Sequence, residues 1–68
     1  METSARNQLR GTISSVQLGN VMAEVVVAVG DAKVVAAITK ESAERLGLAE
    51  GQSVTAIIKA TDVMIGVG

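Results

Sequence analysis

Alternating apolar and polar positions predict that most of this chain forms β-strands. In the first segment, Leu9, Gly11 and Ile13 share one face of an extended backbone, opposite polar neighbours. After Ser14 and Ser15 the apolar positions change parity, so the next apolar side chains would point to the other face. A bulge or a sharp bend at these two serines is the simplest explanation.

The next two strands are predicted to form a hairpin. Val21–Val29 is the first of them, and Gly30 and Asp31 supply a tight turn into Lys33–Ile38. Both faces of Val21–Val29 are largely apolar, whereas a small monomer should present one polar face to water. We therefore expect another subunit to cover the outer face, although a small barrel with a few exposed valines would show the same pattern.

A short helix is expected where the apolar period changes from 2 to 3.6, over residues 40–46. Thr39 is a good N-cap, because its hydroxyl can accept a hydrogen bond from the first turn. Gly47 is typical of the residue after a helix end, with Leu48 folding back in a Schellman-type contact. A helix this short depends on packing and not on intrinsic propensity.

Two more strands, at 53–59 and 63–67, complete the pattern. The order of elements is that of an all-β, OB-type five-stranded antiparallel barrel, with the short helix between strands 3 and 4. Residues 1–68 form a single domain, and a chain of this length buries only about 60% of its unfolded surface. A monomer would therefore be marginal, which favours a homo-oligomer.

The composition narrows the chemistry that the chain can support. Its 68 residues include no histidine, cysteine or aromatic side chain, although 49% of them are hydrophobic. The usual general base, the thiolate nucleophile and the soft ligands of a transition metal are therefore missing. We expect no enzyme, no catalytic residue and no site for a free metal cation.

Charge and hydropathy argue against a nucleic-acid partner and against a membrane-spanning segment. The formal net charge is −1, and aromatic platforms for single-stranded nucleic acid are absent, so no nucleic-acid partner is expected. The longest apolar run, Val25–Val29, is too short to span a membrane, and residues 1–4 do not resemble a signal peptide. The lack of cysteine fits a reducing compartment, most simply the cytoplasm.

Three polar features interrupt the valine-rich pattern and form the candidate site. They are an N-terminal group (Ser4, Ala5, Arg6 and Asn7), the hydroxyl residues Thr39 and Ser42 at the predicted helix start, and Lys59. A helix start presents free N–H groups, the hydroxyls add donors and the lysine adds a full charge. A site made of donors suits a small tetrahedral dianion such as molybdate, tungstate or sulfate, and disfavours hydrogen phosphate, whose P–OH would face another donor.

Each feature also has an ordinary structural explanation. Thr39 and Ser42 are typical residues for a helix start, and a lysine at a strand end is usually solvated. Glu41, beside the candidate hydroxyls, opposes anion binding. None of these signals is specific when taken alone.

The three segments TSARNQLRG, ITKESAERLGLAEG and IIKATDVMIG, in this order, resemble the molbindins, the small molybdate-binding (Mop-type) proteins of bacteria built on a transport-associated OB domain. The resemblance covers residues 3–66. It implies a cytoplasmic OB-type barrel whose single-module members form hexamers, as trimers of dimers. These members bind molybdate or tungstate at subunit interfaces, without an organic cofactor.

The resemblance also implies a role for each candidate residue. Ser4, Ala5, Arg6 and Asn7 match the segment that wraps the oxyanion through side-chain and backbone N–H groups, and Lys59 matches the charge contact. Thr39 and Ser42 match hydroxyls that a neighbouring chain can supply. Because the chain has one module and no attached DNA-binding or ATPase domain, the resemblance implies storage or buffering of the anion for molybdenum homeostasis and cofactor synthesis. Residues 4–7 should then be ordered, leaving Met1 and Glu2 as the free tail.

Two other classes remain open. The segment ITKESAERLGLAEGQSVTAII also resembles the swapped-hairpin transcriptional regulators and antitoxins, which are dimeric DNA binders with basic surfaces. The net charge of −1 and the scattered positions of Arg6, Arg10 and Arg45 argue against that class. The third class is a purely structural subunit, in which the polar groups serve only as caps and strand ends.

Overall fold

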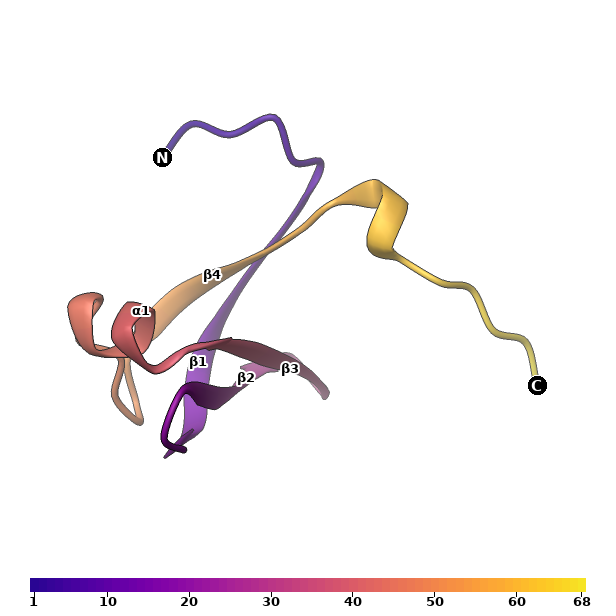
Figure 1. Cartoon of the computed structure of the whole chain (residues 1–68). Coiled ribbons are helices and arrows are strands. Elements are labelled where there is room, and N and C mark those ends of the chain that lie inside the picture. Colours follow the sequence, from indigo (N-terminus) through magenta and orange to yellow (C-terminus); the bar gives the residue numbers. More distant parts are fainter.

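One long strand, β1 (Asn7–Leu18), connects the two halves of the structure (Figure 1). The computed structural model describes residues 1–68. The second half of β1 pairs with β2, and its first half pairs with β4, both antiparallel. The resulting four-stranded sheet has the order β3-β2-β1-β4, with β2 at Met22–Val29, β3 at Ala32–Thr39 and β4 at Ser53–Ile58.

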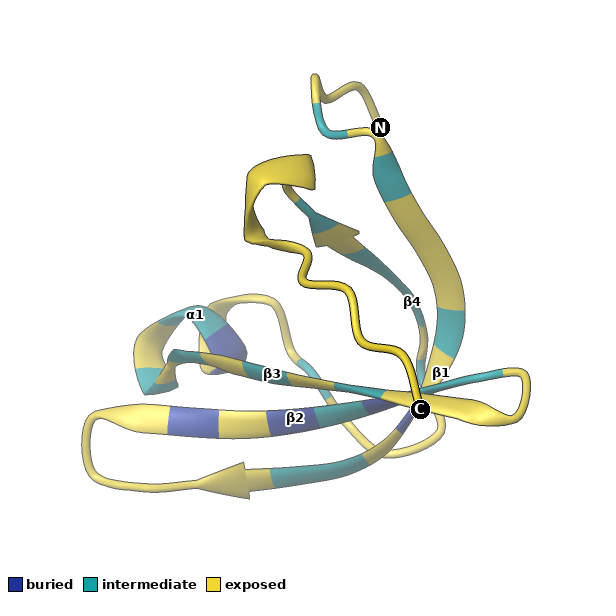
Figure 2. Cartoon of the chain, turned by 90° about the vertical axis from the view of Figure 1, so that its right-hand side faces the viewer, coloured by how far each residue is buried: buried dark blue, intermediate teal, exposed yellow.

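The predicted irregularity in β1 is confirmed. The register against β2 shifts between Ile13 and Ser15, which leaves Ser14 as an extra residue. The Ser14 hydroxyl donates a hydrogen bond of 3.2 Å to the backbone carbonyl of Val26. A bulge bends a strand and increases its twist. β1 can therefore leave the β2–β3 hairpin and continue along β4 (Figure 2).

The predicted hairpin is also confirmed. Val29 and Ala32 are the last paired residues of β2 and β3, so Gly30 and Asp31 form a two-residue turn. Gly30 has a φ of 57°, a backbone conformation that glycine adopts without a steric penalty. The inner face of this hairpin supplies much of the small buried core, which consists of Ile13, Ala23, Val25, Val27 and Ala43.

The helix α1 (Lys40–Arg45) has the capping residues that its sequence predicts, although it ends one residue earlier than expected. The Thr39 hydroxyl accepts a hydrogen bond from the backbone N–H of Ser42 at 3.1 Å. At the other end Gly47 has a φ of 63°, and the N–H of Leu48 donates to the carbonyl of Ala43 at 3.1 Å. These are the features of a Schellman motif, and Leu48 packs against the core.

The predicted fifth strand at 63–67 is not formed. After β4 the chain makes a short 3-10 helix, η1 (Ala60–Asp62), and residues 63–68 then run on without regular structure. Every residue of this C-terminal tail is exposed, with Met64 at 91% and Ile65 at 90%. An isolated strand has no backbone partners, and the tail does not pair with either edge of the sheet. The all-β class and the place of the helix are correct, but this chain by itself has four strands and not five.

The open sheet leaves a large apolar groove on its concave side. The groove has a volume of about 840 Å³, and 15 of its 18 lining residues are hydrophobic. Its lining includes Val25 and Val34 from the hairpin and Val54 and Ile58 from β4. On the opposite face of the hairpin, Met22 is 48% exposed, and Val35 on the edge strand β3, which also lines the groove, is 62% exposed. These residues belong to the second apolar surface that the sequence predicts. Neither surface is covered within the chain.

Candidate anion-binding site

The N-terminal segment and the end of β4 meet at one end of the sheet. Asn7, the first residue of β1, pairs with Ile58, the last residue of β4, so Arg6 and Lys59 follow directly beyond this pair. Ser4, Ala5 and Arg6 line an open depression of about 500 Å³ together with Lys59. Four of the seven predicted site residues, distant in the sequence, therefore meet in a single chain.

The chemistry of this depression favours an anion. Arg6 and Lys59 bring two positive charges, and no carboxylate is among the lining residues. Ser4 adds a hydroxyl that can donate a hydrogen bond. A concave surface lined by one sign of charge concentrates ions of the opposite sign. The remaining lining residues are Ile57, Ala60 and Thr61.

Two local hydrogen bonds tie the N-terminal segment together. The backbone N–H of Ala5 donates to the Thr3 hydroxyl at 3.2 Å, and the Gln8 side-chain amide donates to the Ala5 carbonyl at 2.9 Å. For Ala5 to bind an anion through its N–H, the bond to Thr3 must be exchanged for a bond to the ligand. Asn7 differs from its three predecessors, because it lies in β1 and does not line the depression.

Thr39 and Ser42 lie elsewhere, at the junction of β3 and α1. The Thr39 hydroxyl donates to the Ser42 hydroxyl at 2.7 Å and also accepts the Ser42 N–H. Because Thr39 has its own hydrogen committed, the hydrogen of the Ser42 hydroxyl is the one available for an external acceptor. The two hydroxyls thus form a preorganised pair that offers one free donor, the Ser42 hydroxyl.

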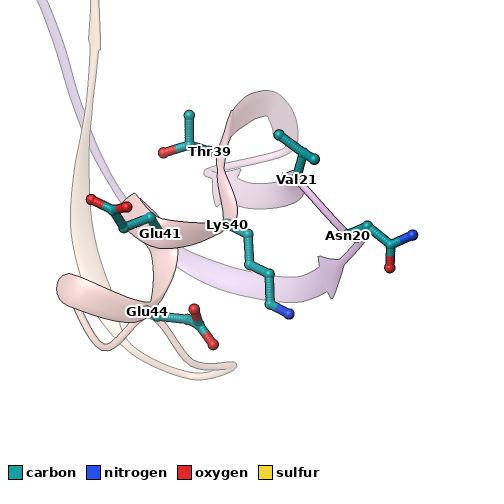
Figure 3. Close-up of a pocket in the computed structure, with 6 residues that line it drawn as sticks. All are labelled: Asn20, Val21, Thr39, Lys40, Glu41 and Glu44. Carbon is teal, nitrogen blue, oxygen red and sulfur yellow. The ribbon is translucent and has the colours of Figure 1, made fainter.

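A second polar depression adjoins this donor pair. It is lined by Asn20, Val21, Thr39, Lys40, Glu41 and Glu44 (Figure 3). In Figure 3 the side chain of Thr39 points away from those of Lys40 and Glu44. The two carboxylates make this depression less favourable for an anion than the one around Lys59.

The two groups of candidate residues do not meet within one chain. The depressions around Lys59 and around Thr39 have no lining residue in common. In Figure 1, η1 and the N-terminal segment lie at one end of β4 and α1 lies near the other. A six-residue strand such as β4 spans about 20 Å, far more than the width of a small oxyanion. The two groups of candidate residues are therefore separate within a single chain.

Thr61 is a lining residue that the sequence prediction left out. It lies in the same depression as Arg6 and Lys59. The only sequence signal that could have found it is its position two residues after Lys59, on the turn that leaves the strand. A threonine in such a turn is ordinary, so this signal is weak.

The fold and this site define the class of the protein. The family model of the TOBE domain matches residues 3–65, and the chain belongs to this family. The resemblance to the small molybdate-binding proteins is thereby confirmed at the level of the family.

Two of the similar proteins match this chain over nearly their whole length. The chain is 52% identical to "Molybdenum-pterin-binding protein 3" of Clostridium pasteurianum over 66 residues, which cover 96% of this chain and 97% of the relative. It superposes on a molybdate-binding protein from Sporomusa ovata with a TM-score of 0.92 and 39% identity, over 98% of this chain and all of the other. It also matches the molybdate-bound form of the cytoplasmic molybdate-binding protein ModG, with a TM-score of 0.84 and 46% identity, over 88% of this chain and 43% of ModG.

No group of three or more histidine, cysteine, aspartate or glutamate residues is arranged to hold a metal ion. Neither helix has the length and apolar character that crossing a bilayer requires.

Proposed function

We propose that this chain binds molybdate or tungstate in the depression around Lys59. The observation that carries the proposal is the meeting of Arg6 and Lys59 with Ser4 and Ala5, in a depression without a carboxylate. Two cations balance a dianion, and the hydroxyl and backbone donors suit an oxyanion that has only acceptors. The close similarity to a molybdenum-pterin-binding protein and to two molybdate-binding proteins supports this choice of ligand.

The complete site is proposed to form between two copies of the chain. One copy supplies the group around Lys59, with Asn7 at its edge, and another copy supplies Thr39 and Ser42. The separation of the two half-sites within a single chain supports this arrangement, because one small ion cannot contact both. In the assembled site the Ser42 hydroxyl would donate to the anion while Thr39 orients it.

The missing fifth strand has the same explanation. The tail at 63–68 is apolar and unpaired, and the chain has an uncovered apolar groove and free sheet edges. The tail of one copy is proposed to pair with the sheet of another and to complete a five-stranded OB-type barrel there. This exchange removes exposed edges and buries apolar surface in both copies.

Further association is proposed through the outer face of the hairpin, where Met22 and Val35 are exposed. Dimers joined through this face would give the hexamer, a trimer of dimers, that the family resemblance implies. The protein is further proposed to store or buffer the oxyanion in the cytoplasm, without an organic cofactor, and to supply it to cofactor synthesis. The description of ModG as a cytoplasmic protein supports this location.

The test combines native mass with calorimetry on the purified protein. We expect an oligomer that contains molybdenum or tungsten by elemental analysis and that binds added molybdate tightly, with weak competition from sulfate and phosphate. Salt-sensitive binding to duplex DNA would favour the regulator class instead. A melting temperature that does not change with molybdate concentration would favour a purely structural subunit.

A further inference from the structure

Thr61 lies on the turn that follows Lys59 after the end of β4. Lys59 is the residue that precedes the 3-10 helix η1, and Thr61 is the middle residue of that helix. Both residues line the depression that also contains Ser4 and Arg6. None of the side-chain hydrogen bonds in the chain involves the Thr61 hydroxyl. This hydroxyl is therefore free to bond to a ligand.

The turn fixes Thr61 relative to Lys59 through the backbone. The N–H of Asp62 donates to the carbonyl of Lys59 at 2.9 Å, and the N–H of Val63 donates to the carbonyl of Ala60 at 3.3 Å. These two bonds fix the backbone on both sides of Thr61, which lines the depression. The Asp62 carboxylate, one residue further on, does not line the depression.

We propose that the Thr61 hydroxyl is a further ligand of the bound oxyanion, donating a hydrogen bond to one of its oxygens. The proposal rests on the proposed function, because it assigns one more donor to the same site. A threonine hydroxyl rotates freely and has one hydrogen to donate, which an oxyanion without a proton can always accept. Thr61 thereby extends the set of donors on the Lys59 side of the site, where Ala60 offers no side-chain donor.

The experiment measures molybdate affinity by calorimetry for the parent and three variants. Thr61→Val keeps the shape of the side chain and removes the hydroxyl, so we expect binding to weaken roughly tenfold to a hundredfold, as for the loss of a hydrogen bond to a charged group. Thr61→Ser restores the hydroxyl and should bind within a few-fold of the parent. Thr12→Val makes the same chemical change at an exposed position of β1 that lines neither polar depression, and should leave affinity unchanged.

The possible outcomes separate the two proposals. If the parent binds molybdate and Thr61→Val binds equally well, Thr61 is not a ligand and the proposed function stands. If Thr61→Val instead lowers the melting temperature of the ligand-free protein or changes its native mass, Thr61 stabilises the turn or the assembly, which also overturns its role as a ligand. If the parent itself does not bind molybdate, the proposed function fails and this inference fails with it.

Discussion

At the scale of single residues, Arg6 and Lys59 carry the charge on which the proposed function depends. They reach the depression from opposite ends of the sequence, and no carboxylate lines the same surface. The loss of either charge would leave a dianion short of a partner. The N-terminal segment contributes shape in addition, since Ala5 and Gln8 hold it in place by local hydrogen bonds.

Replacing Lys59 with alanine tests this charge directly. We expect Lys59→Ala to weaken molybdate binding about a hundredfold, because it removes one partner of a charged, hydrogen-bonded pair. Calorimetry at fixed ionic strength measures the change. Lys33→Ala removes the same charge from an exposed site on β3 that lines no polar depression and should bind like the parent. Equal binding by Lys59→Ala and the parent would show that the anion does not lie at this depression.

Single residues also show what the sequence can and cannot predict about a site. The roles of Thr39 and Gly47 at the ends of α1 follow from local backbone chemistry, and both are confirmed. The meeting of Ser4 with Lys59 depends on the pairing of β1 with β4, which local patterns do not specify. Thr61 was missed for the same reason, because only the folded turn brings its side chain to the depression.

At the scale of elements, the close approach of β1 to β2 requires a glycine at position 11. A Cβ atom on Gly11 would collide with the carbonyl oxygen of Ala28 and would lie 2.8 Å from Val27 Cγ1 and 2.9 Å from Val29 Cγ2. The Ala28 oxygen belongs to the backbone, so it cannot move aside as the end of a flexible side chain can. Gly11 therefore permits the close approach through which β1 is shared by β2 and β4.

Gly11→Ala is expected to lower the free energy of unfolding by about 2 kcal/mol, which is typical of overpacking in a well-packed region. Chemical denaturation at a fixed protein concentration measures this value, since the stability of an oligomer depends on concentration. Unchanged stability of Gly11→Ala would mean that the two strands do not approach so closely.

The elements themselves were predictable to different degrees. The bulge near Ser14, the Gly30 turn and the short helix each have a local chemical signature, and all three are present. The strand expected at 63–67 has the right alternation, but alternation says nothing about which edge a strand will join. Within one chain no edge takes this tail, so the pattern predicted a strand that the single chain does not form.

At the scale of the whole molecule, the proposed assembly explains both the uncovered surfaces and the separation of the candidate site residues. The tail, the apolar groove and the separated half-sites are all accounted for if two copies exchange their tails and complete one another's sites. Only five residues of the chain are fully buried, which is a small core for an independent domain. The sequence predicted an oligomer from its size and its apolar faces, but not which surfaces would be left open.

A charge in the tail should prevent this assembly. We expect Ile65→Asp to shift the protein toward smaller species in analytical ultracentrifugation, because burying an unpaired carboxylate in an apolar groove is costly. Ala32→Asp adds the same charge at an exposed position in the hairpin and should keep the native mass of the parent. If Ile65→Asp assembles as the parent does, the tail does not lie in an apolar interface.

The most direct test of the shared site is to mix two defective variants. Lys59→Ala damages one proposed half-site by removing its charge. Thr39→Asp damages the other, because the new carboxylate would repel the anion, and it keeps the helix capped because aspartate is a good N-cap residue. Each variant alone should bind molybdate poorly. Co-assembly of equal amounts should restore tight binding at about one site in four. Each of the two halves of a site then comes from an undamaged chain with a chance of about one half, and tight binding needs both. Calorimetry of the unfolded and refolded mixture measures the number of tight sites, with each refolded variant alone as the control. Restoration of tight sites in the mixture alone is the predicted result, and a mixture that binds no better than the two variants separately would contradict a site shared between chains.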